Sequence, residues 1–124
     1  MQVSEVMTNH PHVLDADDTA LIAAQTLAQN DIGAVPVTDG ERLIGMLTDR
    51  DIVVRVVAKN LNPADTLLNE IVSGQPRYCY EDEDTEHVAS NMDELLVRRL
   101  PVVDRNKRLV GIVSIEDIRP RQAS

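Results

Sequence analysis

Val35-Pro36-Val37-Thr38-Asp39, followed after a short polar segment by Gly45-Met46-Leu47-Thr48-Asp49-Arg50-Asp51-Ile52, occurs twice in this chain. The counterparts are Leu100–Asp104 (LPVVD) and Gly111–Ile118 (GIVSIEDI). The offset is 65 residues for the first block (101 − 36) and 66 for the second (117 − 51). One residue has therefore been gained in the polar turn between the blocks, where an insertion costs least.

The duplication covers nearly the whole chain, because Val13-Leu14-Asp15 also parallels Cys79-Tyr80-Glu81. Two copies are too few for a stacked solenoid, so we expect a closed pair of repeats related by a pseudo-two-fold axis. We place the first repeat at residues 1–60, a linker at 61–66 and the second repeat at 67–124. Each repeat alone would bury only about 60% of its unfolded surface, so the two should pack on each other.

Composition restricts the classes of function. The net charge of −9, from 12 basic and 21 acidic residues, argues against nucleic-acid binding. No apolar run is long enough to span a membrane, and the first ten residues resemble no secretion signal, so we expect a cytoplasmic protein. Cys79 is the only cysteine, which precludes an internal disulfide and suits a reducing compartment.

Hydrophobic spacing predicts the order strand, helix, strand, strand, helix in each repeat, which is an α/β fold. In the first repeat a helix should start at Asp18-Thr19 and end with a stop at Gly33, and Pro36 should mark an edge or irregularity of the next strand. Thr66 should cap a short helix that ends at Ile71. We expect the following helix residues to face the core: Leu21, Ala24, Leu27 and Ala28; Ile52, Val53, Val56 and Val57; and Val88, Met92, Leu95 and Leu96.

The two repeated motifs resemble those of the cystathionine β-synthase (CBS) domain. The apolar-Pro-Val-x-Asp strand and the Gly-apolar-apolar-Thr/Ser-x-x-Asp-Ile join both occur twice and in order, and a tandem pair resembles a Bateman module. Asp31-Ile32-Gly33-Ala34 with Gly45–Val53 further resembles small standalone bacterial CBS-pair proteins such as the hypoxic-response proteins. The resemblance implies a regulatory module that binds an adenine nucleotide or adenosyl ligand in the cleft between the repeats.

Thr48-x-x-Asp51 and Ser114-x-x-Asp117 each allow two interpretations. The structural one is a capping box, in which the hydroxyl and carboxylate bind free amides at a helix start. The functional one uses the same groups for a phosphate and a ribose diol. The resemblance implies that role, since the matching Thr/Ser and Asp of the family contact the phosphate and ribose of adenine nucleotides.

Arg98 and Arg99 precede Leu100-Pro101, whereas the first copy has Gly33 and Ala34 at these positions. Two arginines at a helix-to-strand junction are commonly solvated or bind the last carbonyls of the helix. A guanidinium is also the side chain best suited to a phosphate, and the family resemblance favours Arg99 for this contact. We therefore expect two non-equivalent sites.

An adenine ring needs a flat apolar slot, and each side chain that could supply it is also a candidate for the core. The strand-edge candidates are Val13, Leu14, Val35, Pro36, Cys79, Tyr80, Leu100 and Pro101. Other chemistry finds little support. Gly40-x-x-x-x-Gly45 lacks the Lys and Ser/Thr of a phosphate loop, and His10, His12, His87 and Cys79 form no recognisable zinc set. We expect no bound metal and no catalytic residue.

The sequence thus predicts a sensor whose ligand is AMP, ADP, ATP or a related adenosyl compound and whose downstream protein target is unknown. The alternative is a ligand-independent dimeric scaffold for protein interactions, and an enzyme with a cryptic site is least favoured. The resemblance implies a homodimer formed through the helices. Ile22, Ala23 and Ala24 support this expectation because they widen the apolar face of their helix.

Overall fold

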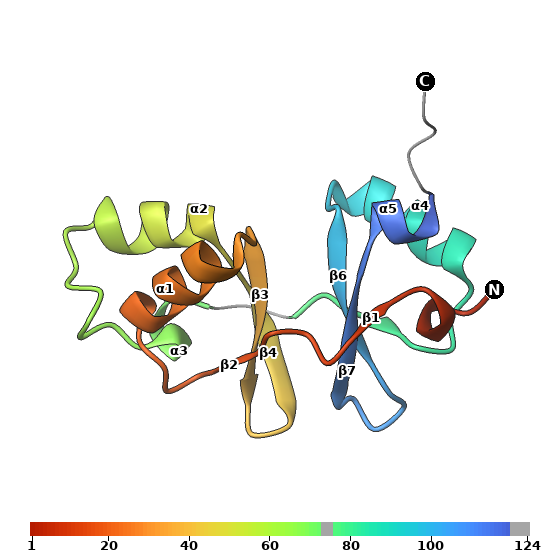
Figure 1. Cartoon of the computed structure of the whole chain (residues 1–124), viewed down its shortest axis with the longest axis horizontal. Helices are drawn as coiled ribbons and strands as arrows, with labels where there is room; N and C mark the ends of the chain where they lie inside the picture. Colours follow the sequence, from red (N-terminus) through yellow and green to blue (C-terminus); the bar gives the residue numbers. More distant parts are fainter. Residues whose placement is uncertain (73–75, 120–124) are drawn as a thin grey trace. The chain divides into compact units, whose positions relative to one another are not determined.

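The computed structural model describes residues 1–72 and 76–119. The chain forms two compact units (Figure 1). The continuous unit is the single stretch His12–Pro76, whereas the split unit joins Met1–Pro11 to Arg77–Ser124. The bounds of these units differ from 1–60, 61–66 and 67–124, which we expected for the two repeats and the linker. The expected repeat bounds stay a prediction, and residues 120–124 lie outside the described residues.

The continuous unit contains a three-stranded sheet in the order β2-β3-β4, with β2 parallel and β4 antiparallel to β3. Its core is made of aliphatic side chains, including Val35, Leu47 and Leu68. The elements in chain order are β2 (Leu14–Asp15), α1 (Ala20–Asn30), β3 (Ala34–Asp39), β4 (Arg42–Thr48), α2 (Asp49–Ile52), the π-helical turn η2 (Val53–Val57) and α3 (Leu68–Ile71).

The split unit contains a four-stranded sheet in the order β1-β7-β6-β5. Its last five elements repeat the order strand, helix, strand, strand, helix, as do the first five of the continuous unit, so the predicted α/β class and order are confirmed. The elements are η1 (Val3–Glu5), β1 (Thr8–Asn9), β5 (Cys79–Tyr80), α4 (Thr85–Leu95), β6 (Arg99–Val103), β7 (Leu109–Ser114) and α5 (Ile115–Ile118).

The N-terminal segment is built into the split unit, which the sequence did not indicate. Val3 is fully buried in the core with Val88 and Met92, and its amide donates to the Glu83 carbonyl (3.0 Å). Strand β1 then pairs antiparallel with the edge of β7, where Thr8 lies opposite Ile112. Residues at the start of the chain therefore complete a core formed by its second half.

Residues 61–66, expected to be a linker, support the start of α1. The carbonyls of Thr66 and Pro63 accept hydrogen bonds from the amides of Ala20 (2.8 Å) and Leu21 (3.1 Å). Thr66 does not cap α3, because its hydroxyl donates to the Asn62 carbonyl (2.9 Å) and the α3 cap is instead made by Glu70. The capping prediction for Thr66 is therefore wrong.

The first helix of the continuous unit forms where expected, but its end and its buried face differ from the prediction. Thr19 caps α1, and Asp31 rather than Gly33 takes the left-handed conformation that ends it (φ 51°). The buried side chains are Ala20, Ala23 and Leu27. The spacing predicted a helix, yet the packing of the sheet selects a face rotated away from the expected residues Leu21, Ala24 and Ala28.

The other two predicted faces are also partly wrong. In the 51–59 segment only Val56 is buried, and Val53 and Val57 are 58% and 65% exposed. The Ala58 amide donates to the Val53 carbonyl (2.8 Å), an i→i+5 bond that shifts the helix face. In α4, Val88 and Met92 are buried as expected, but Leu95 is 39% exposed and Leu96, the left-handed C-cap, is 91% exposed.

Pro36 lies in the central strand of its sheet and not at an edge. Strand β2 pairs with β3 only from Val37 onward, so the missing amide of Pro36 costs no β2 hydrogen bond. The register irregularity falls one residue later, between Val37 and Thr38, and recurs in the split unit between Val102 and Val103. The duplicated motif therefore gives the same irregularity twice. None of the helices in the described ranges combines the length and apolarity needed to cross a membrane.

Candidate ligand-binding site

Two strand-to-helix junctions carry the hydroxyl and carboxylate pairs predicted from the sequence. After β4, the Asp51 amide donates to Thr48 Oγ1 (3.1 Å), and the Thr48 amide donates to Asp51 Oδ2 (2.8 Å). After β7, the Asp117 amide donates to Ser114 Oγ (3.2 Å), and the Ser114 amide donates to Asp117 Oδ2 (2.8 Å). The capping-box interpretation is confirmed at both junctions.

Capping leaves the second oxygen of each carboxylate for other partners, and here the two junctions differ. Asp51 Oδ1 lies 3.9 Å from Arg55 Nε. Among the residues that the structure describes, Asp117 Oδ1 has no hydrogen-bond or ion-pair partner. Because a carboxylate accepts about four hydrogen bonds, Asp117 keeps acceptor capacity for a ligand hydroxyl, whereas Asp51 shares its capacity with Arg55.

Arg99 is placed beside Ser114 by strand register. The two residues are direct partners in the antiparallel pair of β6 and β7. Side chains of directly opposed residues project from the same face, with Cβ atoms about 5 Å apart. Arg99 is exposed and, within the described ranges, forms no ion pair. A guanidinium, a hydroxyl and a carboxylate with a free oxygen thus occur together at one end of the split unit.

The neighbouring Arg98 is held differently. Its Nη2 donates to Glu116 Oε1 (2.9 Å), and its carbonyl accepts from the Ile115 amide (2.8 Å). In the continuous unit the residue opposite Thr48 is Ala34, so that junction has no cation at the position of Arg99. The two junctions therefore differ in charge, because Arg99 lies opposite Ser114 whereas Ala34 lies opposite Thr48.

Most of the predicted apolar residues lie in the cores of their own units. Leu14 and Val35 belong to the core of the continuous unit, and Cys79 and Leu100 to that of the split unit. Pro36 and Pro101 are also buried, whereas Val13 is 42% exposed. The core role is thus established for the buried members, and contact with an adenine ring stays a prediction.

Tyr80 is not brought together with Arg99. It pairs with Val103, four residues along β6 from Arg99, which corresponds to roughly 13 Å of strand. The Arg105 guanidinium carbon lies 4.2 Å from the centre of the Tyr80 ring, and its Nε and Nη2 donate to the Asp82 carboxylate (2.9 and 2.7 Å). Tyr80 therefore belongs to a separate surface cluster at the other end of β6.

Titrating groups in this part of the split unit are shifted for identifiable reasons. The hydrogen bond from Arg105 holds the pKa of Asp82 below its usual value. A side-chain hydrogen bond with Tyr78 raises the pKa of Tyr80. Burial, helped by the charge of Glu83, raises the pKa of the Cys79 thiol to about 12, so the reactive thiolate is disfavoured in this core residue.

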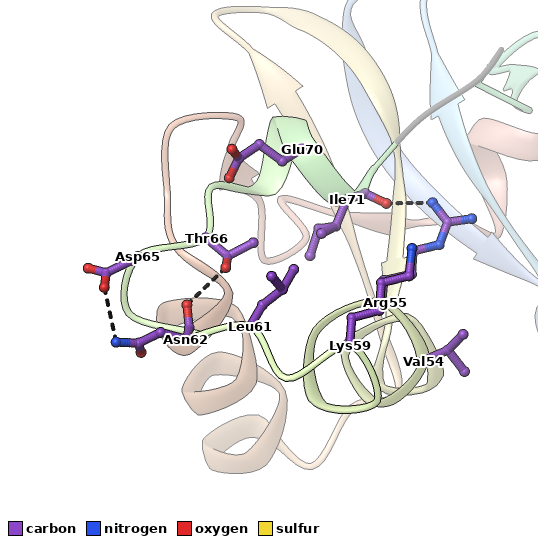
Figure 2. A pocket seen from close by; sticks show the side chains of 9 residues that line it. All are labelled: Val54, Arg55, Lys59, Leu61, Asn62, Asp65, Thr66, Glu70 and Ile71. Carbon is purple, nitrogen blue, oxygen red and sulfur yellow. Dashed lines mark hydrogen bonds between the residues drawn. The ribbon is translucent and has the colours of Figure 1, made fainter.

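The continuous unit contains a pocket of about 750 Å³ that the sequence did not lead us to expect (Figure 2). One wall is formed by η2 and the residues that follow it, and the other by the segment that leads into α3 and by α3 itself. The available signal was the pair Arg55 and Lys59, four residues apart and therefore on one side of a helical segment. The lining residues are Val54, Arg55, Lys59, Leu61, Asn62, Asp65, Thr66, Glu70 and Ile71.

No three metal-binding side chains of the His, Cys, Asp and Glu types come together within residues 1–72 and 76–119. The His87 ring lies 4.0 Å from Glu83, with no third group that would complete a metal site. The expectation of a protein without a bound metal stays a prediction.

Comparison with known proteins identifies relatives over nearly the full chain. The model of the CBS domain family matches residues 3–58 and 68–123. Hypoxic response protein 1 of Mycobacterium tuberculosis is 40% identical over 102 residues, which cover 82% of this chain and 71% of that protein.

Solved structures give the same result. Hypoxic Response Protein I with two coordinated zinc ions is 34% identical with a TM-score of 0.88, and the match covers 99% of this chain and 100% of the other. The CBS domain pair of protein MJ0100, in complex with 5′-methylthioadenosine and S-adenosyl-L-methionine, is 30% identical with a TM-score of 0.81, over 96% and 93% of the chains. The sequence resemblance to hypoxic-response proteins is confirmed.

Proposed function

Because this chain belongs to the CBS domain family, we propose that it is a regulatory module that binds an adenine nucleotide or a related adenosyl ligand. The observation that carries the proposal is the placement of Arg99, Ser114 and Asp117 at one junction. The MJ0100 domain pair, 30% identical, is a relative whose structure holds two adenosyl compounds, which supports the ligand class.

Each of the three side chains has a distinct task in this proposal. Arg99 neutralises the phosphate of AMP, ADP or ATP through charge-assisted hydrogen bonds. The Ser114 hydroxyl adds a donor, since its oxygen already accepts from the Asp117 amide. Asp117 Oδ1 accepts hydrogen bonds from the ribose hydroxyls.

The junction at Thr48 and Asp51 should bind a nucleotide more weakly than the junction at Ser114 and Asp117. Ala34 stands where the split unit has Arg99, and Asp51 faces Arg55 at 3.9 Å. The counterpart of Arg99 is therefore missing, and the carboxylate already faces a cation. We propose that this junction favours an uncharged adenosyl ligand over a nucleotide.

Calorimetric titration of the purified protein with AMP, ADP, ATP, adenosine and 5′-methylthioadenosine tests the function. We expect at least one of the five to bind, with Asp117→Asn weakening the affinity and Asp51→Asn leaving the tighter nucleotide site unchanged. Asn is a good helix-capping residue, so the junction should remain folded. If none of the five binds at about 1 mM, a free energy near −4 kcal/mol, the scaffold function replaces this one.

A specific observation supports the predicted homodimer, which is also the basis of the scaffold alternative. Leu21 and Ile22 on α1, and Val53 and Val57 on η2, are 38–65% exposed. Exposed apolar side chains on the helices of one unit are typical of a protein interface, and α1 packs beside α2, which η2 continues. We propose that a second copy covers them, and light scattering that shows a monomer at micromolar concentration would contradict this.

We further propose that the module has no catalysis of its own and acts in the cytoplasm by presenting a ligand-dependent surface to a downstream protein. The burial and raised pKa of its one cysteine are consistent with the absence of a thiol nucleophile. Incubation of the protein with ATP, followed by chromatography, tests this: the nucleotide should be recovered unchanged.

A further inference from the structure

The pocket of the continuous unit lies apart from the residues proposed to bind nucleotides. Its volume is about 750 Å³, and none of Thr48, Asp51 or Ala34 lines it. A volume of this size lies within the range of small-molecule sites and equals a sphere about 11 Å across.

The charges of the pocket are separated in space. Arg55 comes from η2 and Lys59 from the turn after it, whereas Asp65 comes from the segment that leads into α3 and Glu70 from α3 itself (Figure 2). Leu61 lies between the two groups. The two cations and two carboxylates that line the pocket form a dipole across it, and Asp51, which is not a lining residue, lies 3.9 Å from Arg55 Nε.

Contacts within the unit fix both ends of this dipole. Arg55 Nη1 donates to the Ile71 carbonyl (2.6 Å), and its Nε faces Asp51 at 3.9 Å, so the guanidinium is held against the wall. At the other end, Glu70 Oε2 accepts from the Leu67 amide (2.8 Å), and this contact leaves Oε1 as an acceptor. The pocket is therefore preorganised by its own structural contacts.

Lys59 is the adaptable member of the set. It is exposed and, among residues 1–72 and 76–119, has no ion-pair or hydrogen-bond partner. Its long stem allows the ammonium to reach a group inside the pocket while Arg55 stays in place.

We propose that this pocket binds a short peptide of two or three residues through its two free termini. The carboxylate of the peptide pairs with Lys59, because Arg55 is held by Ile71 and Asp51. The ammonium pairs with Glu70, because Asp65 already accepts a hydrogen bond from Asn62 (3.0 Å), and the peptide body covers Leu61. Three extended residues span about 10 Å, which matches the pocket, whereas the charges of a single amino acid are too close together to reach both ends. A nucleotide fits poorly because it has no cationic group to place against Glu70.

Titration of the full chain with trialanine, followed by backbone amide NMR shifts, tests the proposal. Two further probes each remove one charge: trialanine amide lacks the carboxylate, and N-acetyl-trialanine lacks the ammonium. We expect trialanine to bind at millimolar concentration, with shifts at residues 54–71, and each blocked peptide to bind roughly fivefold more weakly, as for one solvent-exposed ion pair.

Two variants identify which end of the peptide lies where. Lys59→Gln should bind trialanine and its amide with nearly equal affinity, because the contact that distinguishes them is gone. Glu70→Gln keeps the α3 capping box, in which Gln replaces Glu well, and should bind trialanine and N-acetyl-trialanine with nearly equal affinity. Lys107→Gln and Glu94→Gln remove the same charges from the split unit and should change neither preference.

Three results would overturn the proposal. The first is no shift at residues 54–71 with about 10 mM trialanine. The second is binding of all three peptides with equal affinity by the wild-type protein. The third is a retained carboxylate preference in folded Lys59→Gln or a retained ammonium preference in folded Glu70→Gln. None of these results bears on nucleotide binding, which is measured separately.

Discussion

Substitution of Val3 by alanine should destabilise the split unit, although Val3 belongs to the first sequence repeat. Val3 is fully buried in the core that contains Val88 and Met92. The change removes two methyl-sized groups, worth about 1.6 kcal/mol of transfer free energy, and the cavity left behind raises the loss to about 2–3 kcal/mol. The backbone hydrogen bond from the Val3 amide to Glu83 survives, so the effect isolates side-chain packing.

Native-state hydrogen exchange is the assay, because it reports where stability is lost. We expect the protection of amides in α4 and β6 to fall by about 30-fold or more, while amides in β3 and β4 change little. Val13→Ala is the matched control, since the same groups are removed from a side chain that is 42% exposed and the loss should stay within about 0.5 kcal/mol. Equal loss of protection in both units, or loss in the continuous unit alone, would refute the assignment of the N-terminal segment.

Three other predictions follow from individual contacts. A Cβ at Gly111 would lie 2.8 Å from the Thr8 carbonyl oxygen of β1, so Gly111→Ala should lower the free energy of unfolding, measured by urea denaturation, by about 1–3 kcal/mol. Gly33→Ala is the control and should change this free energy little, because the nearest atom to its Cβ, Asp49 Oδ2, would be 3.8 Å away. Cys79, with its pKa raised to about 12, should stay unreactive toward a thiol reagent at pH 8 until the protein unfolds, and a reductant should leave the melting temperature unchanged; rapid labelling of native protein would contradict this. Arg105 lowers the pKa of Asp82, so the stabilising contribution of this pair is present above the usual pKa of an aspartate and is lost as the pH falls through the lowered value. In Arg105→Gln, NMR titration should show that the pKa of Asp82 has risen toward its usual value. An unchanged pKa would mean that Arg105 does not cause the lowering.

The repeated motifs of the sequence predicted the order of elements and both capping boxes because these depend on neighbours along the chain. Thr48 and Asp51, or Ser114 and Asp117, are three residues apart, so their hydrogen bonds form wherever the helix starts. The two copies can also be aligned residue by residue, so the sequence alone shows that Arg99 in the second copy corresponds to Ala34 in the first.

The buried faces of the helices were predicted less well, because a spacing pattern gives the helical period but not which of two apolar stripes the sheet covers. Leu21 and Leu95 satisfy the spacing and are exposed, while Ala23 and Ala89 are smaller and fully buried. The π-helical turn at Val53–Val57 also rotates the following side chains around the helix axis, and no residue in this segment has a preference that predicts such a turn.

The role of the N-terminal segment could not be predicted because its signal is long-range. Strand β1 has two residues, and its pairing with β7 joins positions about a hundred residues apart. Val3 lies between the polar residues Gln2 and Ser4, and this local pattern does not indicate that its side chain is buried. The pocket around Lys59 was missed for a similar reason, since its walls come from segments with no shared motif.

The proposed phosphate contact is tested most directly by calorimetry, in which the affinities of Arg99→Ala for AMP and for adenosine are compared with those of the wild-type protein. We expect AMP binding to weaken about tenfold or more while adenosine binding stays unchanged, because only the phosphate contact is lost. Arg98→Ala should change AMP binding much less, since Arg98 is held by Glu116 at 2.9 Å. An Arg99→Ala protein that binds AMP as tightly as the wild type, or that loses AMP and adenosine equally, would contradict the proposed site.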